Sequence, residues 1–276
     1  MIKRLLPLLA LTLLLCGCSE EQKSPYGDEL FVLQQQDAYT MFDECQVSHW
    51  TMGMMNQDYY CIQNEDGEMV EILMVEHPTG PEGVRNNGLC YDDLGETAKA
   101  AIGAYYEEQG LLYDLAFEVE NAYAEYERRE NNKRLFNWHY ISQTVWPTGG
   151  TEEVIAFCTE LIAYRGEEDV RQEWYNVIFD RETGERISME SVFAVPLEEA
   201  KDLILDELMP EELEKDEKDL RKQMEDAFLV DYIKLMNDGI EVMFPVGTLD
   251  CKEKAFGGFI PAEKLEAVLQ PWAMNP

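Results

Sequence analysis

Basic residues and histidines are scarce in this chain of 276 residues. There are 22 lysines and arginines against 56 aspartates and glutamates, and three histidines, so the formal net charge is −34. Nucleic acids are bound mainly by basic side chains that neutralise phosphates, so we expect no nucleic-acid partner. A strongly acidic surface attracts cationic ligands and speeds their encounter, although solubility alone is a sufficient explanation of the charge.

Known catalytic signatures are missing as well. The sequence contains no HExxH, GxSxG, GxxxxGK[ST] or GxGxxG pattern. His49, His77 and His139 are far apart, and no two of them share a helix face. His139 alternates with Trp138 and Tyr140 on a predicted strand and is interpreted as structural, and His77 is given no role. The sequence therefore predicts no catalytic residue, no cofactor and no metal site, and we expect the protein not to be an enzyme.

Two acidic patterns nevertheless allow a catalytic or a metal-binding interpretation. Asp92 and Asp93 have the types of a general acid and base, but they precede a helical pattern, so helix capping is the favoured interpretation. Residues 64–68 read NEDGE, which resembles a fragment of a calcium loop. The glycine is not at the sixth position of an EF-hand, so a hairpin turn is preferred.

The cysteines contain no CxxC pair, which leaves a redox or zinc motif unsupported. Two of the seven, Cys16 and Cys18, belong to the N-terminal region discussed next. An odd number then remains, so at least one thiol is expected to be unpaired. Cys45 and Cys61 are candidates for pairing across neighbouring strands, and Cys158 has the pattern of a buried thiol. The connectivity stays open among Cys45, Cys61, Cys90, Cys158 and Cys251.

The one long apolar run is at the N-terminus. Met1-Ile2-Lys3-Arg4 precedes an apolar stretch over 5–15 that is interrupted only by Thr12. This length is typical of a signal peptide and is too short to span a bilayer as a helix. Leu15-Cys16-Gly17-Cys18 resembles a lipobox. We therefore predict a lipoprotein signal peptide over 1–17, lipid (palmitate-type acyl chains on a diacylglycerol) on Cys18, and a polar tether over 18–38.

The anchor sets the expected location. The lipid would hold the protein on a cell membrane, facing the extracytoplasmic side of the cell envelope, with inner or outer membrane undetermined. Stable anchoring by acyl chains needs more than one chain. The alternatives are an ordinary cleaved signal peptide and an uncleaved anchor. Removal of Lys3 and Arg4 with the signal peptide would take the net charge from −34 to −36.

Strands and helices are predicted in blocks. Strands are expected within 39–75, including a hairpin of 59–63 with 69–75, followed by a loop over 77–88. Apolar residues at helical spacing predict helices over 94–110 and 111–129. Further strands are expected at 136–146, 154–164, 174–180 and 255–260, and a hairpin of 228–236 with 240–244. Further helices are expected at 197–208 and 211–225, and after Pro261.

These blocks favour an α+β fold with largely antiparallel sheets, packed helices and two adjoining units. We place an N-terminal α+β domain at 39–166 and a C-terminal α+β domain at 167–276. The Asn237-Asp238-Gly239 turn supports the second hairpin, because glycine tolerates tight-turn geometry. The charged stretch 211–219 is interpreted as a solvated helix.

The C-terminal half resembles a known family. The residues that carry the likeness are YNVIFDRETG at 175–184, ISMESVF at 187–193, DGIEVMFP at 238–245, GGFIP at 257–261 and Leu265. They resemble the extracytoplasmic domain of RsiV-type anti-sigma factors, a domain that is also found in secreted bacterial lipoproteins of unknown function. Residues 70–166 are similar in layout to its partner domain.

The resemblance implies a cell-envelope location and lysozyme recognition. It does not imply anti-sigma activity, because no sigma-binding segment precedes the predicted signal peptide, and no deacetylase domain follows. The sequence departs from the family at 165–169, where a glycine-histidine stretch is common, and at Ser191, which replaces an aspartate. We expect a non-catalytic binding module for lysozyme-like cationic proteins or cell-wall ligands. The alternatives are a carboxylate-dependent cell-wall glycan hydrolase and a structural envelope assembly partner.

Overall fold

The computed structural model describes residues 33–34, 38–42, 45–52, 55–63, 67–131, 136–166, 169–210 and 219–274, with only the strand backbone before residue 57. The predicted signal peptide, Cys18 and most of the predicted tether lie outside these residues. Strand β1 (Leu33–Gln34) falls inside the range 18–38, so the chain pairs in a sheet before the predicted end of the tether. No helix in the described part of the chain is long and apolar enough to cross a membrane.

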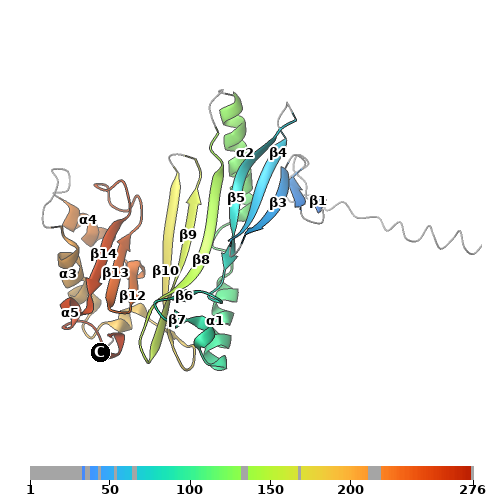
Figure 1. Cartoon of the computed structure of the whole chain (residues 1–276). Helices are drawn as coiled ribbons and strands as arrows, with labels where there is room; N and C mark the ends of the chain where they lie inside the picture. Colours follow the sequence, from blue (N-terminus) through green and yellow to red (C-terminus); the bar gives the residue numbers. More distant parts are fainter. Residues whose placement is uncertain are drawn as a thin grey trace, which may run out of the picture.

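A nine-stranded sheet forms most of the fold, in the order β1-β2-β3-β4-β5-β8-β9-β10-β11 (Figure 1). Every neighbouring pair is antiparallel except β5 and β8, which are parallel because two helices connect them. The strands after β1 are β2 (Ala38–Phe42), β3 (Cys45–Met52), β4 (Met55–Gln63), β5 (Met69–Thr79), β8 (His139–Gly150), β9 (Val154–Tyr164), β10 (Val170–Asp180) and β11 (Arg186–Ile187).

The two connecting helices cover one face of this sheet. Helix α1 (Glu96–Gln109) packs through Ala98 and Ile102 on the ends of β8, β9 and β10. Helix α2 (Leu115–Asn131) packs through Val119 and Ala122 over β4, β5, β8 and β9. Alternate residues of β9 that face the helices are fully buried, as their period of two predicts; they are Ile155, Phe157, Leu161 and Ala163.

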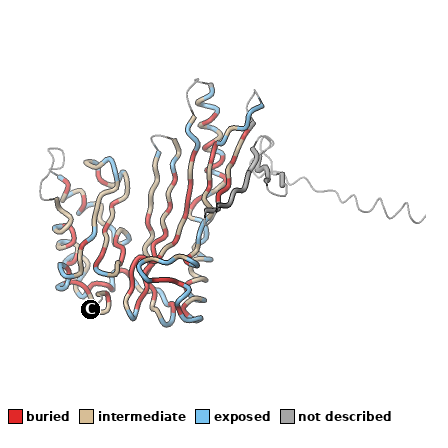
Figure 2. The backbone as a smooth tube through the Cα atoms, viewed as in Figure 1, coloured by how far each residue is buried: buried red, intermediate tan, exposed pale blue. Residues whose placement is uncertain are grey.

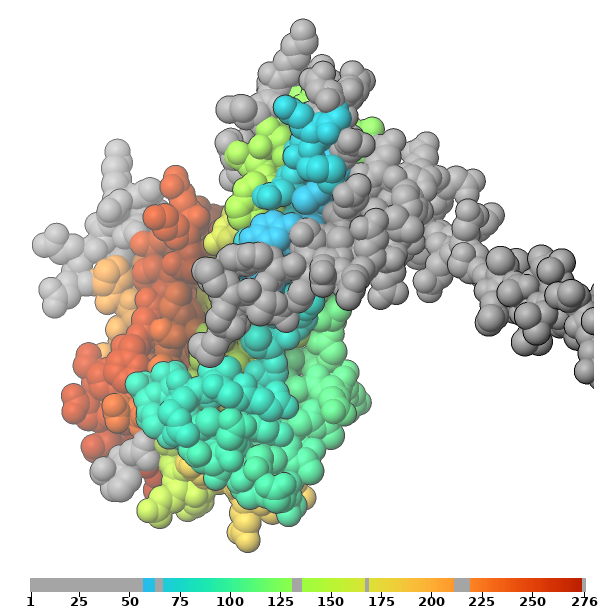
Figure 3. Space-filling model, turned by 45° about the vertical axis from the view of Figure 1, so that its right-hand side comes forward, coloured from blue at the N-terminus to red at the C-terminus, as the bar shows by residue number. Residues whose placement is uncertain are grey.

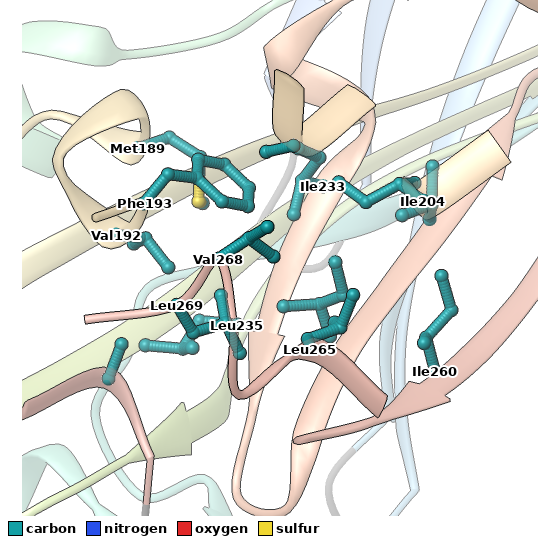
Figure 4. Close-up of a cluster of buried hydrophobic side chains, with 14 of the residues drawn as sticks. Met189, Val192, Phe193, Ile204, Ile233, Leu235, Ile260, Leu265, Val268 and Leu269 are labelled. Carbon is teal, nitrogen blue, oxygen red and sulfur yellow. The ribbon is translucent and has the colours of Figure 1, made fainter. Parts of the chain in front are cut away.

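The C-terminal unit, defined here as residues 188–274, packs against the opposite face. It contains a three-stranded sheet of β12 (Ile233–Met236), β13 (Gly239–Phe244) and β14 (Phe256–Pro261). Its helices are α3 (Leu197–Leu208), α4 (Leu220–Ala227) and α5 (Ala262–Leu265). Its buried core, shown in Figure 4, continues into Val154, Ala156 and Ile178 of the large sheet. The fold is therefore α+β with largely antiparallel sheets, as predicted.

The sheet does not break at 166/167, where the sequence predicts the domain boundary. Strands β9 and β10 flank that point and pair from Tyr164↔Val170 to Val154↔Asp180. The C-terminal unit instead begins after β11, and its core borrows side chains from β9 and β10. Sequence patterns do not reveal that β9 and β10 pair across this point, because a hairpin turn and a linker share the same polar, glycine-containing composition.

Several helices and strands begin or end at other residues than predicted. The predicted loop 77–88 contains the end of β5 together with β6 (Arg85–Asn86), which pairs with β7 (Leu89–Cys90) just beyond the loop. Residues 228–232 are not strand: they include the short helix η3 (Val230–Tyr232). Residues 211–218 of the predicted charged helix lie outside the described part. The remaining short helices are η1 (Tyr91–Asp93), η2 (Met189–Val192) and η4 (Pro271–Ala273).

Gly239 holds the predicted turn between β12 and β13 for a steric reason. A Cβ atom at this position would lie 2.2 Å from the carbonyl oxygen of Ile260 on β14, which is far inside van der Waals contact. The turn therefore needs glycine because the neighbouring strand approaches closely.

Candidate binding groove along strand β10

The structure separates the residues that the sequence singles out. Cys18 lies outside the described residues. Asp92 and Asp93 do not cap α1, whose N-cap is Gly95. Asp92 instead accepts a hydrogen bond from the backbone of Gly83 at 3.0 Å, and Asp93 pairs with Arg85 at 2.9 Å. Their interpretation as caps is wrong: they fasten the loop before α1.

The two histidines whose side chains are described are also apart. His139 is 1% exposed on the helix-covered face of the sheet and stacks on Phe136 with 6.0 Å between ring centroids. Burial lowers the pKa of His139, with Glu125 and Glu118 acting in the opposite direction. His77 lies in β5, not in a loop, and its Nε2 is 3.0 Å from Asp58 on β4. Neither histidine lies beside the groove described below.

The described cysteines are all free thiols: Cys61, Cys90, Cys158 and Cys251. Cys61 lies opposite Gln46 in the register of β3 and β4 and is a free thiol, so the candidate disulfide between Cys45 and Cys61 is not formed. Cys158 is fully buried, as predicted, and burial raises its pKa to about 12. A thiol held protonated in this way is a poor nucleophile.

Strand β10 has an open edge at its first half. Strand β9 pairs with all of β10, but β11 on the other side pairs only with Ile178 and Phe179. Farther along, the side chain of Asn176 donates to the carbonyl oxygen of Asp231 in η3 at 2.7 Å, which closes the edge there. No strand in the described ranges pairs with residues 170–175 on their outer side.

A groove of about 600 Å³ runs along this edge. One wall is β10 from Val170 to Tyr175, and the other belongs to the C-terminal unit. That second wall consists of Leu229, Asp231, Tyr232, Pro245, Val246 and Thr248. Figure 3 shows the C-terminal unit, in orange and red, standing beside the strands of the large sheet. In Figure 2, this half of β10 is largely intermediate in burial, whereas its other end is buried.

Most charged side chains at the groove are paired with one another. Arg171 forms two hydrogen bonds with Glu173, at 2.7 and 2.9 Å, and Tyr175 donates its hydroxyl proton to the same carboxylate. The Arg171 guanidinium lowers the pKa of Glu173. Glu173 is therefore an anion at neutral pH and does not suit the role of a general acid, which needs a raised pKa.

Beneath the groove, an aromatic side chain is fixed from several directions. The indole Nε1 of Trp174 donates to Glu160 at 2.9 Å, and Gln172 donates to the same carboxylate oxygen at 3.0 Å. The Lys234 ammonium lies 5.0 Å from the Trp174 ring centroid and 2.8 Å from Glu241. Such cation–π and hydrogen-bond contacts hold the indole in one orientation. Trp174 thus forms a rigid base for a ligand in the groove.

The groove has the features of a binding surface. It offers an open strand edge, a fixed indole and an apolar side chain, Leu229, that is 52% exposed. The described residues contain no group of three or more metal-ligating side chains. Sequence reasoning missed this site, since its two walls are about sixty residues apart. The one available signal was the predicted strand 174–180, which carries Trp174 and Tyr175 at its start.

The solved structures that are similar to this chain include two bacterial proteins. A DUF3298 family member from Bacteroides fragilis NCTC 9343 has a TM-score of 0.45 and 13% sequence identity, covering 81% of this chain and 96% of that chain. A DUF3298 family protein from Pseudomonas aeruginosa PAO1 has a TM-score of 0.35 and 12% identity, covering 84% and 95%. Both likenesses are distant. The sequence matches no family model and no curated protein.

Proposed function

We propose that this protein is a lipid-anchored, extracytoplasmic binding module of the cell envelope that recognises a cationic protein without catalysing a reaction. The observation that carries the proposal is the groove between β10 and the C-terminal unit. The groove is lined by an exposed apolar side chain, Leu229, and by a fixed aromatic side chain, Trp174. Aromatic anchors surrounded by polar groups are typical of protein interfaces.

The charge of the chain supports a cationic partner. A net charge of −34 produces a field that steers basic proteins toward the surface. Charge alone would not distinguish one basic protein from another, so specificity has to come from a desolvated patch such as the groove. The resemblance to RsiV-type domains makes lysozyme-like proteins the first candidates. Cell-wall glycans are the second candidate ligand.

The hydrolase alternative finds less support at the groove. Glu173 is held as an anion by Arg171, and Asp169 lies 3.4 Å from Arg165. A glycosidase needs two carboxylates that face one substrate, one of them with a raised pKa. Glu173 and Asp169 instead pair with neighbouring arginines, which favours a role in shaping the surface.

The test is binding to a lysozyme at roughly physiological salt, where the Debye length is about 8 Å. We expect a dissociation constant in the micromolar range or tighter, which corresponds to about 8 kcal/mol. Cytochrome c serves as the basic control protein and should bind more weakly. Equal binding of the two proteins, or no binding to lysozyme, would reduce the acidic surface to a solubility feature.

A matched pair of variants tests whether the groove is the binding site. Leu229→Asp and Phe259→Asp make the same change at apolar side chains that are 52% and 49% exposed. Leu229 lines the groove, whereas Phe259 lies on β14 away from it. Leu229→Asp should weaken lysozyme binding at least tenfold, and Phe259→Asp should leave it within about twofold, the cost of one charge at a remote surface site. The reverse order would remove the groove from the proposal.

A further inference from the structure

The backbone of β10 presents hydrogen-bonding groups to the groove. In an antiparallel strand, successive residues point their N–H and C=O groups to opposite sides. The amide of Asp180 donates to Glu185 on the outer side, and the amide of Arg181 donates to Glu153, which precedes β9. Even-numbered residues of β10 therefore face outward. The outward groups over the open stretch belong to Val170, Gln172 and Trp174.

These groups have no backbone partner within the described residues on the outer side. Unpaired strand edges act as templates for another strand, and proteins usually shield them. Here the C-terminal unit stands across the groove and does not cover the edge. The stretch from Val170 to Tyr175 extends roughly 17 Å, given a rise of about 3.3 Å per residue. It is long enough for a strand of five or six residues.

We propose that the groove binds an extended, net-basic segment of a partner protein as an additional strand on β10. This deepens the binding function proposed above and rests on it. Main-chain hydrogen bonds to Val170, Gln172 and Trp174 would supply affinity, and alternate side chains would supply specificity. One set of the partner's side chains faces Trp174 and the C-terminal wall, and the other set faces Glu173.

The two sides call for different residue types. Toward the C-terminal unit, the surface presents Trp174, Leu229 and Val246, so apolar side chains fit there. Charged groups of the groove are Asp169, Glu173 and Asp231 against Arg165 and Arg171, and Arg165 also pairs with Glu118. The balance is acidic, and the whole chain reinforces it. The expected segment therefore alternates apolar with basic residues.

A second copy of this chain is a less suitable occupant. Two copies would each bring a net charge of −34 and repel one another. The wall that includes Leu229, Pro245, Val246 and Thr248 also lies across the groove from β10, where it opposes the approach of a whole second sheet. Without the C-terminal unit beside it, the edge of β10 would permit a dimer through sheet extension. With that unit in place, the edge favours a single basic strand as its ligand.

Amide hydrogen exchange of the full chain, purified in detergent, tests the binding mode directly. The probe is a capped octapeptide of alternating lysine and valine at roughly physiological salt. Binding should slow exchange at Val170, Gln172 and Trp174 at least tenfold. Exchange at Arg171 and Glu173 should not change, because β9 already protects those amides. Unchanged exchange at the three outward amides up to millimolar peptide would overturn the proposal.

Two substitutions at one residue separate backbone from side chain. Gln172→Pro removes an outward N–H, and proline is tolerated at such edge positions. Gln172→Ala keeps the N–H and loses only the hydrogen bond of the side chain to Glu160. The first should weaken peptide binding at least tenfold and the second less than threefold. Equal effects would overturn the edge mode, and the exchange experiment on the unsubstituted chain covers the case in which Gln172→Pro does not fold.

The same variants distinguish this inference from the function on which it rests. If lysozyme binds the unsubstituted chain and Gln172→Pro equally well, the binding function stands and the added strand is excluded. If the peptide protects the edge but lysozyme does not bind, the edge site stands and the lysozyme proposal fails. Protection of the three amides in a dimer without peptide would show that a second copy occupies the groove, and would overturn the proposal.

Discussion

Glu118 on α2 and Arg165 at the end of β9 form a paired contact through two hydrogen bonds, at 2.7 and 2.6 Å. The side chain of Glu118 is 3% exposed and that of Arg165 is 15% exposed. Arg165 also lines the groove. The pair therefore joins the helix-covered face of the sheet to the rim of the proposed binding site.

Breaking this pair should be costly. Glu118→Gln leaves the largely buried Arg165 with only its longer contact to the exposed Asp169, at 3.4 Å, and we expect the free energy of unfolding to fall by about 3 kcal/mol. Urea unfolding measures it. Glu96→Gln is the control, because the ion pair of Glu96 with Lys99 lies within one helix and the Glu96 side chain is 93% exposed, so the pair should contribute less than about 1 kcal/mol. Equal losses would show that burial of the Glu118 pair is not decisive.

The stability of the fold should decrease in mild acid because of His139. Burial lowers its folded pKa below the ordinary value of 6.5. As pH falls below 6.5, the unfolded chain takes up a proton that the folded chain resists, so the free energy of unfolding falls. His139→Phe should flatten this dependence between pH 7 and 5. An unchanged slope in that interval, measured by urea unfolding, would contradict it.

A second acid-sensitive window should lie lower. The hydrogen bond from Arg128 lowers the pKa of Glu125 to about 2, and the Thr183 backbone amide lowers the pKa of Asp180. Their contribution is present above the unfolded carboxyl values and is lost as pH falls toward the folded ones. Asp180→Asn should therefore remove part of the pH dependence below about 4 and leave the interval above 5 unchanged.

Gly149 marks the close approach of the two units. A Cβ atom there would lie 2.4 Å from the carbonyl oxygen of Leu235 on β12. Gly149→Ala should therefore push β12 away, with a loss of about 1–3 kcal/mol. Gly258→Ala on β14 is the control, because its Cβ would meet only Leu208 at an ordinary 3.9 Å. Thermal unfolding of the two variants checks the difference; similar melting temperatures would argue against tight apposition.

Lipid attachment can be tested with two neighbouring cysteines. Cys18→Ala should leave a precursor that takes up no labelled fatty acid, since the lipid-bearing thiol is gone. Cys16→Ala should be processed and labelled like the unsubstituted chain. Labelling of Cys18→Ala would show that the anchor is elsewhere.

Local patterns predicted much of the fold. The strand 154–164 and the helix 197–208 have the predicted bounds, because alternation of period two and apolar spacing near 3.6 set the faces that become buried. The open edge of β10 was beyond prediction, since it depends on β11 being only two residues long. Trp174 illustrates the limit: its residue type is visible in the sequence, but its contacts with Glu160 and Lys234 arise only from long-range packing.

The parallel pairing of β5 with β8 has a consequence for how the chain folds. Leu73 lies opposite His139, so this pairing closes a long stretch of chain that includes both intervening helices. Pairings between residues distant in sequence form slowly because chain closure costs entropy before contacts compensate it. Since synthesis starts at the N-terminus, β3, β4 and β5 are made early but reach their place late. The antiparallel hairpin of β9 and β10 pairs residues that are close in sequence, so we expect the edge that borders the groove to form before β5 joins β8.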